Sequence, residues 1–75
     1  MDNNRNDVVT HIEQNGCEII SDKNPKHSVY VNTVDRSLKS ALLKKEYLSD
    51  KYVINVCRCL NISAPVVVQI RNPNQ

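Results

Sequence analysis

The chain has 75 residues with a formal net charge of +2, which leaves room for one small domain and too little charge to identify a partner. Its single glycine, Gly16, excludes Walker, dinucleotide-binding and EF-hand loops, because these need glycines where the backbone approaches phosphate or turns sharply. The absence of Phe and Trp leaves little material for the aromatic platforms of many single-strand binders.

Charge and cysteine content bound the class of protein further. Residues 1–34 hold three Lys and Arg against five Asp and Glu, whereas residues 35–75 hold seven against three, so the second half is basic. Three cysteines make no even disulfide framework, and we interpret them as reduced thiols. The N-terminus is polar and no aliphatic run could span a membrane, so we expect a soluble, cytoplasmic protein without a membrane partner.

The first elements are predicted from apolar spacing and turn residues. Val8, Val9 and Ile12 recur at helical spacing before the stop signal Asn15-Gly16, which predicts a helix over 5–15. Two β-favouring runs, 17–21 and 28–32, flank a loop-forming segment and predict a hairpin. Period-two alternation then places Val29 and Val31 toward the core, with Tyr30 on the other face.

Two further helices and a strand are predicted in the basic half. From Thr33 or Asp35 onward, a second helix carries a stripe of Leu38, Ala41 and Leu42. Ser49 or Asp50 caps a third helix, with one side formed by Val53, Val56, Cys57 and Leu60 and the other by Lys51, Asn55 and Arg58. After Pro65, alternation over residues 66–70 predicts a final strand, with a helix as the alternative.

The expected fold is therefore α+β. Its elements follow the order αββααβ, with a small three-stranded sheet and helices packed on one face. We expect a single domain over residues 1–75, with frayed ends at 1–4 and 72–75.

This order resembles the type II KH fold, and the stretch from Leu42 to Val68 is similar to the core of that family. A short basic link, an amphipathic helix and a Val-rich strand follow one another there. In KH domains the link carries a Gly-x-x-Gly loop that holds the nucleic-acid backbone. Here Lys44 and Tyr47 stand where the glycines would be. The resemblance and the basic half imply binding of RNA or DNA, with phosphates contacted by Lys39, Lys44, Lys45 and Lys51.

Two other functions are compatible with the sequence. A protein-interaction adaptor or inhibitor would use apolar residues that fall off the main helical stripes, namely Leu43, Tyr47 and Ile54. Alternatively, residues 53–70 have the spacing of a helix-turn-helix DNA-binding motif, provided that residues 65–71 are helical.

Catalysis and metal binding have no support in the sequence. No nucleophile stands in a recognisable motif, so we expect no enzyme activity. The cysteines and histidines lack the close paired spacings of zinc ligands. We therefore expect a small binding module without metal or cofactor, in an oligomeric state that the sequence leaves open.

Overall fold

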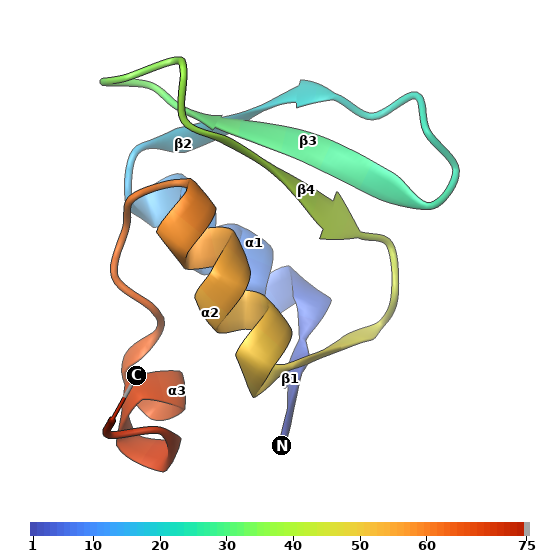
Figure 1. The fold of residues 1–75 in the computed structure, drawn as a ribbon. Helices are drawn as coiled ribbons and strands as arrows, with labels where there is room; N and C mark the ends of the chain where they lie inside the picture. Colours follow the sequence, from blue (N-terminus) through green and yellow to red (C-terminus); the bar gives the residue numbers. More distant parts are fainter. Residues whose placement is uncertain (75) are drawn as a thin grey trace.

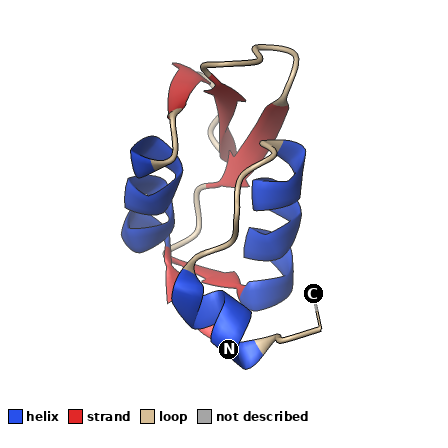
Figure 2. Ribbon diagram, turned by 90° about the vertical axis from the view of Figure 1, so that its left-hand side faces the viewer, coloured by secondary structure: helices blue, strands red, loops and turns tan. Residues whose placement is uncertain are grey.

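The computed structural model describes residues 1–74, which form an α+β fold. Strands β2, β3 and β4 form an antiparallel sheet in that order, and β1 pairs with β5. Helices α1 and α2 lie on one side of the larger sheet (Figures 1 and 2). The predicted α+β class, with a three-stranded sheet and helices on one face, is confirmed. In chain order the elements are β1 (Asp2–Asn4), α1 (Arg5–Gln14), β2 (Cys17–Ser21), β3 (His27–Asn32), β4 (Lys39–Leu43), β5 (Tyr47–Ser49), α2 (Asp50–Cys59) and α3 (Val66–Arg71).

Helix α1 lies where the sequence predicts it. The side chain of Asn4 caps the helix by accepting a hydrogen bond from the backbone nitrogen of Asn6 at 2.9 Å. Val8 and Ile12 are buried in the core. Beyond the helix, Gly16 has a φ of +80°, a left-handed conformation that glycine adopts without strain. This glycine turns the chain from α1 into β2.

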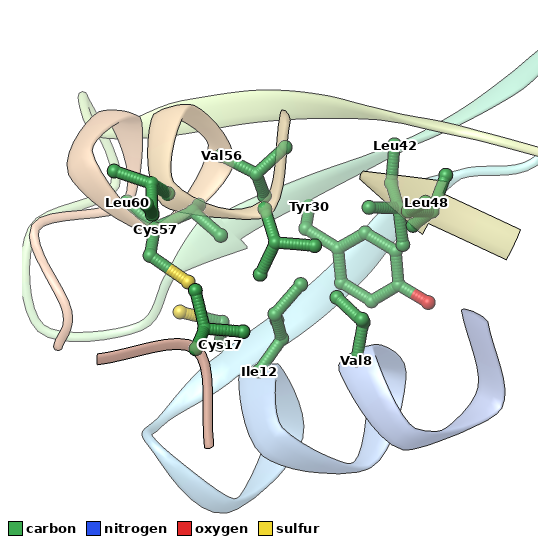
Figure 3. Packing of buried hydrophobic residues seen from close by; sticks show 12 residues of the cluster. Val8, Ile12, Cys17, Tyr30, Leu42, Leu48, Val56, Cys57 and Leu60 are labelled. Carbon is green, nitrogen blue, oxygen red and sulfur yellow. The ribbon is translucent and has the colours of Figure 1, made fainter. Parts of the chain in front are cut away.

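Strands β2 and β3 form the predicted hairpin, but the prediction that Tyr30 faces away from the core was wrong. Tyr30 belongs to the same buried cluster as Val8 and Ile12 of α1 (Figure 3). Because side chains alternate along a strand, Val29 and Val31 lie on the opposite face of β3. Val31 is nevertheless buried there, as predicted, and Val29 is half-buried. The tyrosine ring has the size to fill the space between sheet and helices, which a valine would leave partly empty.

Residues 33–43 form a turn and strand β4, so the predicted second helix was wrong. The side chain of Asn32 accepts hydrogen bonds from the backbone nitrogens of Val34 and Asp35 at 2.9 and 3.2 Å. Asp35 in turn accepts bonds from the backbone nitrogen and the hydroxyl of Ser37. These local bonds reverse the chain before a helix can begin. Residues 39–43 then pair with β3 and satisfy its second edge.

The outer edge of β4 is covered by a side chain from α2. In the ladder with β3, Ala41 and Leu43 direct their backbone groups away from β3. The phenol of Tyr52 accepts a hydrogen bond from the Leu43 nitrogen at 3.1 Å and donates one to the Ala41 oxygen at 3.3 Å. One hydroxyl therefore bonds to groups that another strand would otherwise pair with, which protects this edge from association.

Replacing Tyr52 with phenylalanine is expected to expose this edge while leaving the rest of the sheet intact. The Leu43 amide loses its acceptor, so its hydrogen exchange should become about five- to tenfold faster, as expected for one hydrogen bond of about 1 kcal/mol. Exchange measured by NMR checks this, with the Lys44 amide as control because it donates to the Lys26 oxygen at 2.8 Å. Equal acceleration of both amides would contradict the prediction.

Helix α2 is the amphipathic helix that the sequence predicts. Ser49 caps it by accepting a hydrogen bond from the backbone nitrogen of Tyr52 at 3.2 Å. The residues predicted to face inward are buried, namely Val53, Val56, Cys57 and Leu60. Those predicted on the other side, Lys51, Asn55 and Arg58, are exposed. This stripe packs with α1 and the sheet in one core (Figure 3).

Residues 66–71 form helix α3, so the predicted final strand was wrong. The carbonyl of Pro65 accepts hydrogen bonds from the nitrogens of Val68 and Gln69, both at 3.0 Å. Val68 is completely buried. Although β-branched residues favour strands, the edge of β4 is already covered by Tyr52. Without a partner strand, a helix is the conformation that pairs the backbone groups internally.

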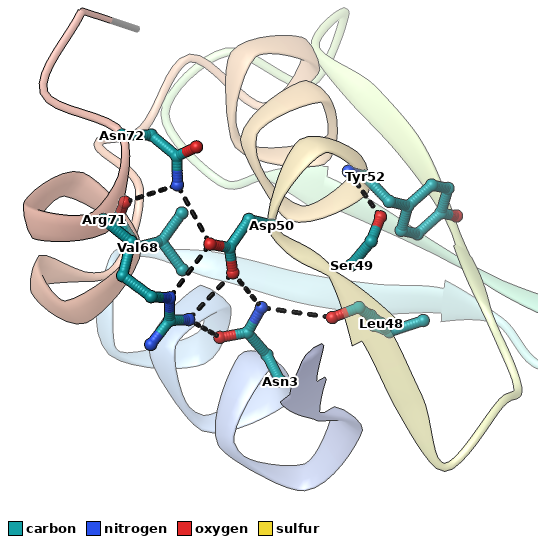
Figure 4. Close-up of polar contacts among 8 residues, drawn as sticks. All are labelled: Asn3, Leu48, Ser49, Asp50, Tyr52, Val68, Arg71 and Asn72. Atoms are coloured by element: carbon teal, nitrogen blue, oxygen red, sulfur yellow. Dashed lines mark hydrogen bonds and ion pairs between the residues drawn. The ribbon is translucent and has the colours of Figure 1, made fainter. Parts of the chain in front are cut away.

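A buried carboxylate fastens α3 to α2 and β1 (Figure 4). Asp50 accepts hydrogen bonds from two nitrogens of the Arg71 guanidinium at 2.8 and 2.9 Å. It also accepts bonds from the side-chain nitrogens of Asn3 at 2.8 Å and Asn72 at 2.9 Å. The bonded Arg71 guanidinium is the main reason that the pKa of Asp50 lies well below its usual range. The cluster joins three segments that are far apart in the sequence.

The two chain ends differ from each other. Residues 1–4 were predicted to be frayed, which was wrong, because Asp2–Asn4 find a pairing partner in Tyr47–Ser49. At the other end, Asn72 donates a hydrogen bond to the Val68 oxygen at 2.9 Å, whereas residues 73 and 74 belong to no helix or strand. Residue 75, also predicted to be frayed, lies outside the described residues.

Candidate functional site

A hollow of about 580 Å³ lies where the start of α1, the β2–β3 loop and the β4–β5 link meet. We call it the basic hollow. Three cations line it together with two carboxylates, several other polar groups and one exposed aliphatic side chain. Its lining residues are Asn4, Arg5, Asn6, Ile19, Asp22, Ser28, Tyr30, Lys44, Lys45 and Glu46.

Arg5 is held in a fixed position at the wall of the basic hollow. Its Nε donates a hydrogen bond to the Leu43 oxygen at 2.7 Å, and a terminal nitrogen donates to the Ser28 hydroxyl at 3.1 Å. The backbone nitrogen of Arg5 donates to the Glu46 oxygen at 2.9 Å. These bonds tie the first residue of α1 to the β4–β5 link. The guanidinium is therefore preorganised, with donors left for a ligand.

Two residues of β3 that carry hydroxyl groups, Ser28 and Tyr30, line the basic hollow. Ser28 and Tyr30 are 2% and 4% exposed, so both side chains are almost entirely buried. Ser28 donates a hydrogen bond to Oδ1 of Asp22 at 2.6 Å. The Tyr30 hydroxyl forms no hydrogen bond with another residue of the described chain. Every unpaired side-chain polar atom of the described residues is accessible to solvent. Because Tyr30 lines the hollow, its hydroxyl opens into it. Burial raises the pKa of Tyr30, which keeps the phenol protonated as a donor.

Asp22 and Lys44 form an ion pair across the mouth of the basic hollow. The Lys44 Nζ lies 2.9 Å from Oδ1 of Asp22 and donates a hydrogen bond to the Asp22 backbone oxygen at 3.1 Å. The hydrogen bond from Ser28, and next the one from Lys44, lower the pKa of Asp22. The carboxylate side chain is 64% exposed, so it reaches the hollow from a solvent-facing loop.

This end of the molecule concentrates positive charge. The β2–β3 loop lies beside the β4–β5 link, because the Lys44 nitrogen donates to the Lys26 oxygen at 2.8 Å. Half of the ten Lys and Arg of the chain are therefore in the hollow or in the loop that borders it, namely Arg5, Lys23, Lys26, Lys44 and Lys45. Against them stand the carboxylates of Asp22 and Glu46. The local charge balance favours an anionic ligand.

The fold brings together two of the four predicted phosphate-binding lysines. Lys44 and Lys45 both line the basic hollow, whereas Lys39 and Lys51 do not. Lys39 begins β4 at the opposite end of that strand, facing Val31 in the ladder. Lys51 lies on the exposed side of α2. Lys39 was predicted on the second helix, whose place β4 takes, and Lys51 was predicted on the third helix, where it lies.

Sequence reasoning missed Arg5. It lies 39 positions before Lys44 and in the acidic half of the chain. No local motif marks it, and its role at the hollow arises from its bonds to Leu43 and Ser28. Only a prediction that β3 and β4 pair beside the start of α1 could have identified it.

The three residues assigned to a protein interface do not form one exposed patch. Tyr47 is 54% exposed, but Ile54 is buried in the core and Leu43 is half-buried against it. Ile54 was expected to be free because it falls off the main stripe of α2. It lies one turn after Asp50, whose carboxylate bonds to Arg71, so this side of α2 faces α3. A protein-interaction function stays a prediction, and these three residues do not provide a common surface for it.

Within residues 1–74 no three His, Cys, Asp or Glu residues could hold a metal ion together, and no helix has the length and apolar character needed to span a membrane. All three cysteines are free thiols, with Cys17 and Cys57 buried and Cys59 exposed. Comparisons with protein-family models, curated proteins and solved structures found no match for this chain. The function is therefore argued from the geometry of the basic hollow.

Proposed function

We propose that the protein binds the phosphate backbone of a nucleic acid at the basic hollow. One observation carries the proposal: Arg5 lines the same hollow as the adjacent Lys44 and Lys45, although it lies 39 positions before Lys44 in the chain. A guanidinium matches the geometry of a phosphate group, and lysines add charge that releases counterions from the nucleic acid. The link that the KH resemblance points to, residues 44–47, supplies three of the lining residues.

The expected binding mode depends on charge and is indifferent to base sequence. Lys23 and Lys26 in the neighbouring loop extend the basic surface beyond the hollow. Tyr30 is buried, so its ring has no free face on which a base could stack. Contacts to phosphate without base readout give affinity that falls with salt and differs little between sequences.

A charge-reversal experiment tests this proposal. The double variant Lys44→Glu, Lys45→Glu should bind labelled single-stranded RNA at least about tenfold more weakly than wild type, because phosphate contacts dominate such affinity. The matched control Lys39→Glu, Lys51→Glu has the same net charge but alters lysines outside the hollow. Fluorescence anisotropy at two salt concentrations, repeated with single-stranded and duplex DNA, gives the affinities.

The control decides the interpretation. If both double variants weaken binding equally, the effect reflects net charge and the basic hollow is not the site. If neither weakens it, the proposal fails. Circular dichroism of each variant verifies that the fold is retained.

The helix-turn-helix alternative requires helical residues 65–71, and residues 66–71 are helical. Other features of α3 do not favour base reading. The helix has six residues, and its exposed side chains include Val66, Val67 and Ile70. Direct readout of base edges needs polar side chains at such positions. The segment that joins α2 to α3, residues 60–65, also exceeds the three- to four-residue turn of the motif. DNA recognition by α3 therefore stays a prediction that neither the side chains of this helix nor the segment before it favour.

A further inference from the structure

The carboxylate of Asp22 is bonded to Ser28 and Lys44, two donors that an anionic ligand in the hollow would also use. Its Oδ1 accepts a hydrogen bond from the Ser28 hydroxyl at 2.6 Å and lies 2.9 Å from the Lys44 ammonium. Arg5 adds a nitrogen 3.1 Å from the same Ser28 hydroxyl. The Lys44 ammonium and the Ser28 hydroxyl thus contact the same oxygen of Asp22, and the Arg5 guanidinium bonds to that hydroxyl.

The basic hollow also contains the Tyr30 hydroxyl, a donor that no other residue of the described chain uses. The Tyr30 side chain is 4% exposed and lines the hollow, and its hydroxyl has no protein partner within residues 1–74. Because no side-chain polar atom of the described residues is both buried and unpaired, this hydroxyl reaches solvent in the hollow. It is a donor that water occupies in the free protein and that a bound phosphate group can use.

We propose that Asp22 occupies the place of a ligand phosphate group, and that a phosphate group displaces its carboxylate from Ser28 and Lys44 when it binds. The inference rests on the proposed function and names the ligand group of the same site. The phosphate is either a backbone phosphodiester of a nucleic-acid strand or a free phosphate ion, which share anionic, non-bridging oxygens as hydrogen-bond acceptors.

Two features favour replacement of the Asp22 carboxylate by a phosphate group. A free phosphate ion carries up to two negative charges at neutral pH, and a strand presents a series of singly charged phosphodiesters, so either can bond to Arg5, Lys44 and Ser28 while adding contacts that Asp22 lacks. Asp22 brings one negative charge, and its largely exposed side chain on a loop can turn out into solvent. Because the loop holds the carboxylate at a high effective concentration, Asp22 acts as an intramolecular competitor that lowers the affinity for phosphate.

Removing this competitor should strengthen phosphate binding. The variant Asp22→Asn is expected to bind inorganic phosphate about five- to tenfold more tightly than wild type, because an amide competes poorly for Lys44. Chemical-shift titrations that follow the Ser28 and Tyr30 amides measure this affinity. The same variant should bind labelled RNA more tightly in the anisotropy assay.

The matched control is Glu46→Gln, which removes the same charge from the lining of the same hollow. The carboxylate of Glu46 forms no ion pair with another described residue, so this variant should change phosphate affinity by less than about twofold. A further variant, Asp22→Asn combined with Tyr30→Phe, should lose part of the gain, since the phenol is expected to donate to the bound phosphate.

The outcomes separate the inference from the proposed function. Equal tightening by Asp22→Asn and Glu46→Gln would overturn the inference, because charge alone would then explain it. So would RNA binding that needs Lys44 and Lys45 but is unchanged by Asp22→Asn, and in that case the proposed function stands. Tighter phosphate binding by Asp22→Asn without any binding of RNA or DNA would support the inference with a free phosphate ion and overturn the proposed function.

Discussion

Replacing Asp50 with alanine is expected to lower the free energy of unfolding by about 3 kcal/mol, the cost of breaking a buried ion pair by removing one partner. Four side-chain hydrogen bonds converge on this carboxylate, two from Arg71 and one each from Asn3 and Asn72. Without it, the guanidinium and both amides lose their common acceptor. The loss should fall most heavily on α3, whose amides should exchange faster than those of the sheet.

The same cluster predicts how stability depends on pH. The pKa of Asp50 is lowered in the folded protein, chiefly by its bonds to Arg71. Its contribution to stability is therefore fully present above the pKa of an unfolded aspartate, about 3.9, and is lost as the pH falls below that value. The wild type should be destabilised by acid more steeply than Asp50→Ala, so the difference between the two should shrink toward pH 2.

Urea unfolding at pH 7 and pH 3, followed by circular dichroism, measures both effects. The control is Asp35→Ala, because Asp35 is exposed and bonds within its own turn to Ser37. This variant loses only local bonds of an exposed turn, so it should cost no more than about 1 kcal/mol at pH 7. Equal losses from the two substitutions would show that the Asp50 cluster does not fasten α3.

Replacing Leu42 with alanine is expected to cost about 3 kcal/mol through the lost apolar burial and the cavity that remains. The Leu42 side chain is completely buried within the main cluster (Figure 3). A chain of this size is marginally stable, because it buries a smaller fraction of its surface than a larger domain. The variant should therefore have a clearly lower unfolding midpoint and a measurable unfolded population.

The control for Leu42→Ala is Val34→Ala, since Val34 is 95% exposed in the β3–β4 turn. Thermal and urea unfolding should show a large change for the first variant and almost none for the second. A small effect of Leu42→Ala would mean that β4 does not pack against the helices as described. Because such core changes reduce stability, binding experiments are best made with variants at the exposed lysines.

Short-range signals were sufficient for the elements that the sequence predicts correctly. The cap of α1 by Asn4, its end before Gly16 and the buried stripe of α2 all depend on residues within a few positions of one another. The β2–β3 hairpin is also local, since its strands are joined by five residues. In each case the periodicity of apolar residues and the bonds of one cap or turn select the conformation.

Two segments were mispredicted because partners elsewhere in the chain determine their conformation. Residues 39–43 have apolar spacing that suits a helix, but β3 offers them an edge to pair with and the Asn32 turn directs them to it. Residues 66–71 have β-favouring valines, but they pair with no strand, and Asp50 binds Arg71 at the end of the helix. Intrinsic preferences of about 1 kcal/mol or less per residue are readily overridden by such contacts.

The candidate site divides in the same way. The sequence by itself determined that Lys44 and Lys45 are adjacent cations in a short link, which is visible without any fold. The tertiary structure alone decided that Arg5, Ser28 and Asp22 join them, and that Lys39 does not. The charges of the two halves of the sequence appear separate, yet pairing of β3 with β4 and the bond from Arg5 to Glu46 place them side by side. Electrostatic attraction depends on distance in space, and separation along the chain does not determine that distance.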